Sequence, residues 1–576
     1  MNQKLENILN VSLDATEDEL RKADSLSTGY NWRDNTWEII VKYSGSLESI
    51  RNRYNVYIKE LLNYYAIIVA DKATIELISQ EDVIDYVEKP KSLYYQIERT
   101  KTAACVGSVR ADGNILSGKG VIVGVIDTGI DIFDNAFRNS DGTTRILNIY
   151  DQTTGEKYDK QSIDEYIRLN EDLSGGTFSY DNAPGVDNIM HGTDVSYIAA
   201  GSLGVAYEAD IIAVKMGYSI NNQFPRTTSL MDAIDYIIRK AIEYRKPVAV
   251  NISYGCNYGA HNGNTLLESF IDDISKSYRC VICVGSGNEA DKAIHFGGII
   301  NTGQVQTAYL NVGEYQSAID IQIWKNYWDT IDVMLINPRG EQIGIITEGR
   351  INRYETYNTE IITLLGEPSP YNIYQEIYIN LIPKTDYILS GIWQIVLMAG
   401  SIRAGEYNIW LPSSQALGYA TAFNNPTADG TITIPATARN CIAVGAYNAY
   451  TNSYAAFSGR GFDNSIRNVN AGVKPDITAP GVDISIARQR GNDITYRNVT
   501  GTSYAVPVVT GAAALLMQWG IVMGNDRFMY GEKLKAALID GSKPVGLVGI
   551  TRNDNQPDPR TGWGAVCLKN TLNKIL

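Results

Sequence analysis

The chain has 576 residues, 44% of them hydrophobic, and a formal net charge of −14 at pH 7. This length predicts several domains with cores of their own. The negative charge and the absence of basic clusters argue against nucleic acid as a partner. No apolar run reaches the ~18 residues that cross a bilayer, so no membrane span is expected.

The first 20 residues are polar and charged and contain no apolar signal core. The six cysteines are scattered. Cys280 and Cys283 have CxxC spacing, but they lie in a predicted buried strand without a second Cys or His pair nearby. Buried thiols are therefore expected there rather than a zinc or redox site. These features predict synthesis in a reducing cytoplasm, without a secretory signal and without disulfides.

The first segment, residues 1–96, shows the pattern of a small α+β domain. Strands are expected at 36–43, 56–59, 64–70 and 83–88, with helices at 47–54 and 73–79. Asp71 can cap the second helix. This β-α-β-β-α-β order is ferredoxin-like. Residues 89–97 follow as an extended linker.

The second segment begins as a parallel α/β domain. Residues 121–126 form a continuous β-rich apolar run that ends in Asp127. Catalytic groups on open α/β sheets lie beyond the carboxyl ends of strands, and Asp127 occupies that position. Polar loop sequence is expected over residues 146–188. His191 then opens a helical stretch, whereas the other two histidines, His261 and His295, lie in polar, glycine-containing loops.

Two further strands, 248–252 and 280–284, are each followed by small and polar residues. The first strand leads into Ser253, Tyr254 and Gly255, and the second into Gly285, Ser286, Gly287 and Asn288. From residue 296 to 419 the pattern changes to short alternating strands with turn residues between them. Such spacing is typical of an inserted β-sandwich or jelly roll.

The last segment, residues 420–576, carries the strongest chemical signal. Gly501 and Thr502 precede Ser503, and an apolar helix follows. The free N–H groups and positive end of a helix stabilise a developing oxyanion. A hydroxyl needs a base within hydrogen-bond reach, and that base needs an anion to orient it. Ser503, His191 and Asp127 supply these three roles, although each residue alone is an ordinary strand or helix end.

Three motifs resemble those of the subtilisin-like serine proteases: Val-Ile-Asp127-Thr-Gly, His191-Gly-Thr and Gly-Thr-Ser503-Tyr-Ala-Val-Pro. The resemblance covers roughly residues 100–300 and 420–576. It implies a subtilisin-like core over 97–295 and 420–576, with Asn288 as an oxyanion donor and no cofactor. It also implies that Ser253, Tyr254, Gly255, Gly285, Ser286 and Gly287 bind the substrate backbone.

The same resemblance implies that residues 1–96 are a propeptide that acts as folding template and inhibitor; an unrelated binding domain is the alternative. Self-cleavage is expected at Gln96. The chain departs from the family pattern at Asp194, where a second His is common. No room is seen for the family's calcium-binding loop, so no metal site is expected.

The propeptide, the inserted β-domain and the missing signal resemble the clostridial germination-specific Csp proteases. This resemblance implies a spore protein of the cortex or coat region that activates the pro-form of a cortex-lytic enzyme by limited proteolysis. Its partners would be that protein substrate and its own cleaved propeptide. Two alternatives stay open: an inactive subtilase-fold sensor or scaffold, and a general intracellular subtilisin.

Overall fold

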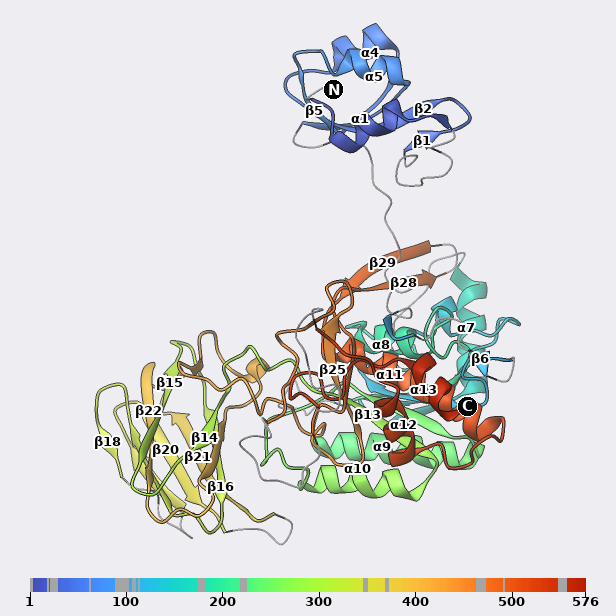
Figure 1. The fold of residues 1–576 in the computed structure, drawn as a ribbon. Helices are drawn as coiled ribbons and strands as arrows, with labels where there is room; N and C mark the ends of the chain where they lie inside the picture. The colour runs from blue at the N-terminus through green and yellow to red at the C-terminus, as the bar shows by residue number, and fades with distance from the viewer. Residues whose placement is uncertain are drawn as a thin grey trace. The chain divides into compact units, whose positions relative to one another are not determined.

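The computed structural model describes residues 4–576 except 18–19, 21–28, 62–63, 89–102, 106–109, 112–113, 175–182, 218–224, 345, 347–350, 368–371, 463–472, 491–492 and 547–556. The chain forms two compact units, Met1–Tyr95 and Gln96–Leu576 (Figure 1). Each unit has its own hydrophobic core.

The N-terminal unit is an antiparallel sheet with helices. Its elements are α1 (Asn7–Asp14), β1 (Tyr30–Asn31), β2 (Thr36–Tyr43), α4 (Glu48–Tyr54), β3 (Tyr57–Leu61), β4 (Tyr65–Ala70), α5 (Lys72–Ile78) and β5 (Ile84–Glu88). The sheet order β5-β2-β4-β3 confirms the predicted ferredoxin-like arrangement. Alternate residues of β2, such as Ile39 and Val41, are buried, and the Asp71 carboxylate caps α5 by accepting from the Thr74 N–H at 2.8 Å. Helix α1 was not predicted.

The second unit is built on a mainly parallel sheet of order β10-β9-β11-β8-β12-β13-β25-β26, with β27 also paired to β25. The strands are β8 (Ile122–Asp127), β9 (Ile146–Asp151), β10 (Glu156–Asp159), β11 (Asp210–Lys215), β12 (Val248–Ile252), β13 (Cys280–Gly285), β25 (Ile442–Asn448), β26 (Ser453–Tyr454) and β27 (Ile477–Pro480). β8, β12 and β13 are buried throughout, as the continuous apolar runs predict.

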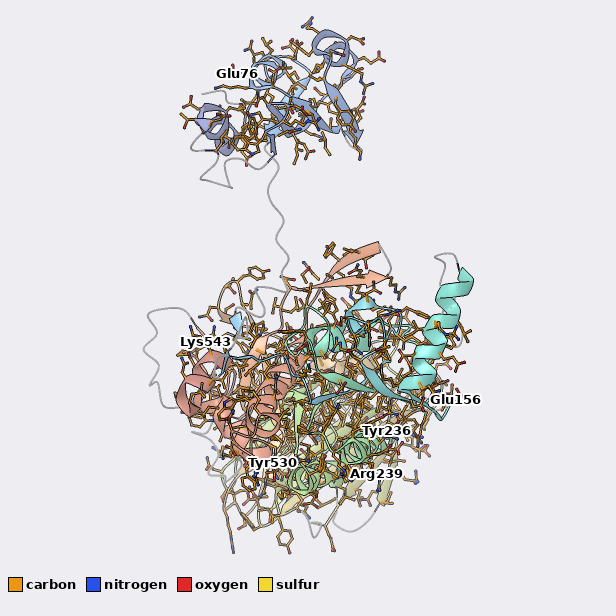
Figure 2. All side chains as sticks on the ribbon, turned by 90° about the vertical axis from the view of Figure 1, so that its right-hand side faces the viewer. Glu76, Glu156, Tyr236, Arg239, Tyr530 and Lys543 are labelled. Atoms are coloured by element: carbon orange, nitrogen blue, oxygen red, sulfur yellow. A yellow bond between two sulfur atoms is a disulfide. The ribbon has the colours of Figure 1, made fainter. Side chains whose placement is uncertain are left out.

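Helices cover both faces of this sheet. On one face pack α8 (His191–Ala200), α11 (Thr502–Met517), α12 (Gly531–Asp540) and α13 (Leu568–Ile575). On the other pack α9 (Thr227–Tyr244) and α10 (Leu266–Ser277). Helix α9 is amphipathic: Tyr236 is buried, whereas Arg239 is exposed and pairs with Asp235 at 2.6 Å (Figure 2). This layered α/β arrangement confirms the predicted fold class of the core.

Residues 146–188 correct the expectation of polar loop sequence. They contain β9, β10 and α7 (Lys160–Ser174). Although α7 is polar overall, Ile163 and Ile167 lie four residues apart and are both buried in the core. These two isoleucines form the one apolar face of the helix, which the polar composition of the segment made hard to recognise in the sequence.

The inserted region is a two-sheet β-domain around one hydrophobic core. One sheet has the order β14-β23-β16-β21-β20-β19 and the other β18-β17-β22-β15-β24. Its strands are β14 (His295–Ile299), β15 (Val305–Val312), β16 (Ile319–Asn326), β17 (Ile331–Ile336), β18 (Gln342–Ile343), β19 (Ile351–Glu355), β20 (Thr359–Leu365), β21 (Tyr374–Pro383), β22 (Gly391–Ala399), β23 (Glu406–Trp410) and β24 (Ala422–Phe423). Strands β14, β15, β19 and β24 were not predicted, and His295, expected in a polar loop, is instead the buried first residue of β14. The jelly-roll connectivity stays a prediction.

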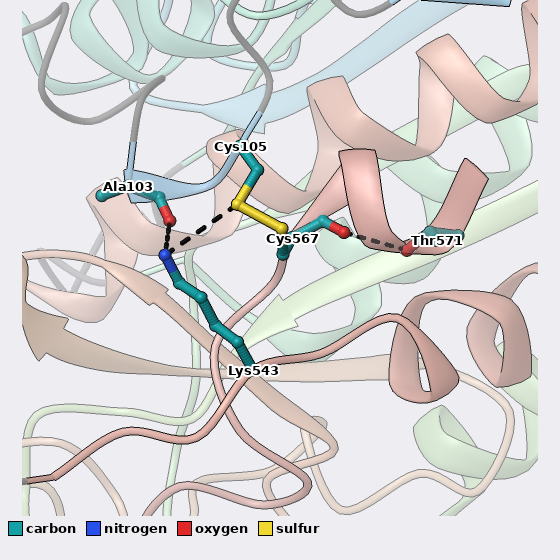
Figure 3. The surroundings of a disulfide bond; sticks show 5 residues. All are labelled: Ala103, Cys105, Lys543, Cys567 and Thr571. Carbon is teal, nitrogen blue, oxygen red and sulfur yellow. Dashed lines mark hydrogen bonds between the residues drawn. A yellow bond between two sulfur atoms is a disulfide. The ribbon is translucent and has the colours of Figure 1, made fainter. Parts of the chain in front are cut away.

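The expectation of a chain without disulfides was wrong. Cys105 and Cys567 form a disulfide between segments 462 residues apart in sequence (Figure 3). Beside it, the Lys543 ammonium donates to the Ala103 carbonyl at 2.5 Å. Cys280 and Cys283 are buried free thiols, as predicted.

The segment Thr502–Val522 is long and apolar enough to cross a membrane by composition alone, with a mean hydropathy of 1.7. It comprises α11 and the following π-helical turn, η3 (Gln518–Val522). Because 89% of the apolar window is buried inside the unit, this segment is the central helix of the core.

Candidate active site

The carboxyl ends of three neighbouring strands meet at one edge of the parallel sheet. β8 ends at Asp127, β12 ends just before Ser253, and β13 ends three residues before Asn288. Helices α8 and α11 begin with His191 and Thr502 and pack against each other. The topology therefore brings the predicted catalytic residues to one edge, as expected for open α/β sheets.

Asp127 and His191 are in direct contact. His191 Nδ1 lies 2.6 Å from Asp127 Oδ1. Asp127 is 1% exposed, whereas the His191 side chain is 26% exposed. The buried carboxylate also accepts from the Thr128 N–H at 2.8 Å. The carboxylate of Asp127 therefore orients the imidazole through Nδ1, while part of the ring stays exposed to solvent.

The approach of α8 to β8 requires glycine at position 192. A Cβ on Gly192 would lie 2.3 Å from the Gly129 carbonyl oxygen and 2.9 Å from the Asp127 Cβ. Any larger residue would therefore push His191 away from its carboxylate. This requirement explains the glycine of the His-Gly-Thr motif.

Two opposing effects act on the pKa of His191. Burial lowers it, because the imidazolium loses solvation. The charge of Asp127 and its hydrogen bond raise it, and the net result is a pKa above the ordinary value of 6.5. The carboxylate thus stabilises the cationic ring that forms when His191 accepts a proton.

A second carboxylate, Asp187, holds the start of α8 and was missed by the sequence analysis. Its Oδ1 accepts from the Met190 N–H at 2.7 Å and from the Thr128 hydroxyl at 2.8 Å. Its Oδ2 accepts from the N–H and hydroxyl of Thr193, both at 2.8 Å. Asp187 therefore links the segment after Asp127 to the first turn of the His191 helix. No local pattern distinguishes it from the surrounding polar residues.

Ser503 is the second residue of α11, and its side chain is partly exposed. The ring of the next residue, Tyr504, lies 5.2 Å from the His191 ring, centroid to centroid. This contact places the start of the nucleophile helix beside the base.

Asn288 is hydrogen-bonded to the start of α11. The Asn288 Oδ1 accepts from the N–H and hydroxyl of Thr502 at 3.0 and 3.1 Å, which turns the amide NH₂ the other way. Gly501 has a φ of +153°, and a Cβ built on it would lie 3.6 Å from Asn288 Nδ2 and 3.8 Å from the Ser503 nitrogen. The amide nitrogen of Asn288 and the backbone nitrogen of Ser503 therefore both lie close to Gly501.

The predicted substrate-pairing segments lie on the same edge. The Asn251 amide donates to the Ser253 hydroxyl at 3.0 Å, and Tyr254 packs beside the core under α9 and α10. Pairing of Cys256 with Ile434 begins just after Gly255. The residues around the end of β13 differ in exposure. Gly285 and Ser286 are buried, and the Ser286 N–H and carbonyl already pair with Val444 and Thr433. Their predicted contact with the substrate backbone therefore has no exposed group to carry it, whereas Gly287 is partly exposed with a φ of +92°. Gln96, the expected cleavage site, lies outside the described residues.

A cavity of about 240 Å³ adjoins this edge. It is lined by Ile130, Asp131, Ile132, Ala183, Val186, Asp187, Asn188, Met190 and Arg490. In the part of the chain that the structure describes, no group of three or more His, Cys, Asp or Glu is arranged to hold a metal ion.

Comparisons with known proteins agree with this geometry. Residues 3–91 match the family described as the Csp protease B prodomain, and residues 118–363 and 404–564 match the subtilase family. Among solved structures, the CspB protease of Clostridium perfringens is 34% identical with a TM-score of 0.74. That match covers 82% of this chain and 96% of the other.

Curated relatives match over shorter stretches. The subtilase-type proteinase RRT12 of Saccharomyces cerevisiae is 33% identical over 22% of this chain and 23% of its own length. Subtilisin-like protease 10 of Arthroderma otae is 34% identical over 21% of this chain and 27% of its own length. The chain thus spans about a quarter of these curated relatives. Because the subtilase match and the CspB structure each cover most of the chain, this protein belongs to the subtilase family of serine endopeptidases and resembles the Csp proteases within it.

Proposed function

We propose that the chain hydrolyses peptide bonds by acyl transfer through Asp127, His191 and Ser503. The observation that carries this proposal is the 2.6 Å contact between His191 and Asp127, at the edge where α11 presents Ser503. The partly exposed Ser503 and His191 suit attack on a substrate carbonyl, whereas the buried Asp127 suits orientation of the base.

In the proposed mechanism, Ser503 Oγ attacks the scissile carbonyl while His191 takes the hydroxyl proton. The same imidazole returns this proton to the leaving amine, and Asp127 stabilises its cationic form. Asn288 Nδ2 and the Ser503 N–H hold the oxyanion in the space beside Gly501. The substrate backbone adds a strand along Ser253–Gly255 and passes beside Gly287 at the edge before Asn288.

Residues 1–96 act as a propeptide in this proposal, and 296–419 as a domain inserted between the two parts of the core, 97–295 and 420–576. The match of residues 3–91 to the Csp protease B prodomain supports the first assignment. Self-cleavage at Gln96 would leave a mature chain that begins in the core. N-terminal sequencing of the purified protein tests this site.

The physiological substrate we propose is the pro-form of a spore cortex-lytic enzyme, and the proposed location is the spore. The similarity to the Clostridium perfringens CspB protease over 96% of that chain supports this assignment. Incubation with such a pro-form should yield one new N-terminus, while a panel of denatured unrelated proteins stays intact. Cleavage of most panel members would instead indicate a general protease.

A serine-reactive fluorophosphonate probe tests the catalytic assignment directly. It should label the parent protein at Ser503 and should not label Ser503→Ala. Asp127→Asn should label far more slowly, because it leaves His191 in the wrong tautomer. A folded parent that resists the probe would indicate an inactive subtilase-fold sensor or scaffold.

A further inference from the structure

A two-stranded hairpin leads directly into the nucleophile. It consists of β28 (Ile484–Arg490) and β29 (Asp493–Val499), and β28 packs against α8 (Figure 1). The Gly501 N–H donates to the Gly481 carbonyl at 2.9 Å and closes the base of the hairpin two residues before Ser503. A displacement of the hairpin would therefore move the start of α11.

The hairpin is tied to α8 by two arginines that pair with one buried carboxylate. Asp194 lies one turn after His191 on α8 and has no exposed side-chain surface. Arg488 donates through Nε to Asp194 Oδ1 at 3.0 Å and makes a second, shorter contact through Nη2. Arg497 contacts the other oxygen, Oδ2. Both carboxylate oxygens of Asp194 are thus held by the hairpin.

The same hairpin also contacts residues close to His191 and Asp127 in the sequence. Arg488 Nη2 also donates to the carbonyl of Met190 at 2.9 Å, the residue just before His191. Arg490 Nε donates to Asp131 at 2.7 Å, four residues after Asp127. The segment that ends in Ser503 therefore contacts both segments that carry its proposed partners.

Asp194 occupies the position where many subtilases have a second histidine. A fully buried carboxylate is unfavourable unless cations and hydrogen bonds compensate it. Two arginines supply that compensation from one element, and both belong to the hairpin. Aspartate at position 194 therefore depends on the two hairpin arginines that neutralise it.

We propose that Asp194 is a positioning residue for His191. It acts through Arg488 and Arg497 to fix the His191 helix against the hairpin that precedes α11 and Ser503. This inference rests on the proposed function. Asp194 touches neither substrate nor reacting atoms in this proposal. Its role is to hold base and nucleophile in register.

The charged groups around His191 make this role testable, because their removal should shift the pKa of His191. The groups that face its surroundings are Asp127 from β8, Asp187 from the preceding loop, Asp194 from α8, Arg488 from β28, Arg497 from β29 and Tyr504 from α11. Arg497 lowers the pKa of His191, against the raising effect of Asp127 and Asp187. Loss of Arg497 should raise that pKa, whereas loss of the Asp194 charge, with both arginines retained, should lower it.

The test measures the second-order rate of fluorophosphonate labelling of the full chain against pH. Arg497→Gln should move the acid limb of this profile upward, and Asp194→Asn should move it downward, each by on the order of half a pH unit. Both should lower the plateau rate by on the order of 10- to 10²-fold, because base and nucleophile lose their register. Arg497→Lys should restore the position of the limb.

Arg239→Gln is the matched control, since Arg239 is an exposed arginine in an ion pair on α9; it should change neither limb nor plateau. Should Asp194→Asn not fold, the partly exposed Arg497 still decides the matter through its Gln and Lys variants. If the parent labels normally but the acid limbs of the two variants do not shift, or shift in the same direction, the role of Asp194 is overturned while the proposed function stands. A folded parent that does not label would overturn the proposed function together with this inference.

Discussion

Replacement of Asn288 separates two functions of one amide. Its Oδ1 accepts from the N–H and hydroxyl of Thr502, at 3.0 and 3.1 Å. Its Nδ2 lies close to Gly501 and is the proposed oxyanion donor. We therefore expect Asn288→Asp to preserve the contacts with Thr502 and to remove the donor.

The expected loss of activity follows from the donor geometry. Removal of one oxyanion donor costs about 2.7–4 kcal/mol, or roughly 10²- to 10³-fold in kcat. Asn288→Ala should show this loss. Asn288→Asp should lose at least as much, because a carboxylate oxygen would face the developing negative charge.

Stability should separate the two variants. Thr502 is only 2% exposed, so Asn288→Ala leaves its N–H buried without its present acceptor. Such a group costs about 1–3 kcal/mol, and the thermal midpoint should fall. Asn288→Asp should stay close to the parent midpoint.

The assay pairs kcat on a cleaved peptide with thermal unfolding of each variant in the Ser503→Ala background, which prevents self-digestion. Thr502→Val is the control, since it removes only the hydroxyl contact and leaves the Asn288 donor in place. It should retain kcat within about tenfold of the parent. An Asn288→Asp variant that cleaves as fast as the parent would refute the oxyanion assignment.

Three further outcomes follow from single contacts. His191 must be neutral to act as a base and its pKa is raised, so kcat/KM should fall as pH drops through a value above 6.5, and Asp127→Asn should move that limb downward. Reduction of Cys105–Cys567 should lower the thermal midpoint, since a 462-residue separation gives up to about 6 kcal/mol in the chain-entropy model; an unchanged midpoint with the thiols shown to be free would contradict this. Trp410→Ala should lower the free energy of unfolding by about 3–5 kcal/mol and make the two-sheet β-domain more sensitive to limited proteolysis, because Trp410, the last residue of β23, is 1% exposed and its indole N–H donates to the Gly430 carbonyl at 2.9 Å; a variant as resistant as the parent would argue against this.

Local patterns predicted the parts of the fold in which burial is periodic. The alternation of residues 36–43 gave β2 with its observed bounds, and the continuous apolar run before Asp127 gave β8. The motif spacing indicated the triad because each member lies at the end of a strand or the start of a helix. In α7 the same reasoning failed, since two buried isoleucines in fifteen residues were outweighed by polar composition.

Contacts between distant segments could not be predicted in this way. The Cys105–Cys567 disulfide joins residues 462 positions apart, and cysteine count alone does not specify a pairing. Asp187 looks like any loop aspartate until the fold brings Thr128 and Thr193 to it. Arg488 and Arg497 read as polar residues of a strand, and only their partner on α8 gives them a role.

The charge balance around His191 connects these missed residues to the chemistry. A base is most effective when its pKa lies near the working pH. The charges of Asp127 and Asp187 raise the pKa of His191 and so favour the cationic ring. A ring that stays protonated cannot accept the Ser503 proton. Arg497 lowers the pKa of His191 and belongs to the hairpin that leads into Ser503. In our proposal one element therefore both keeps the ring available as a base and holds it, through Asp194, in place beside the nucleophile.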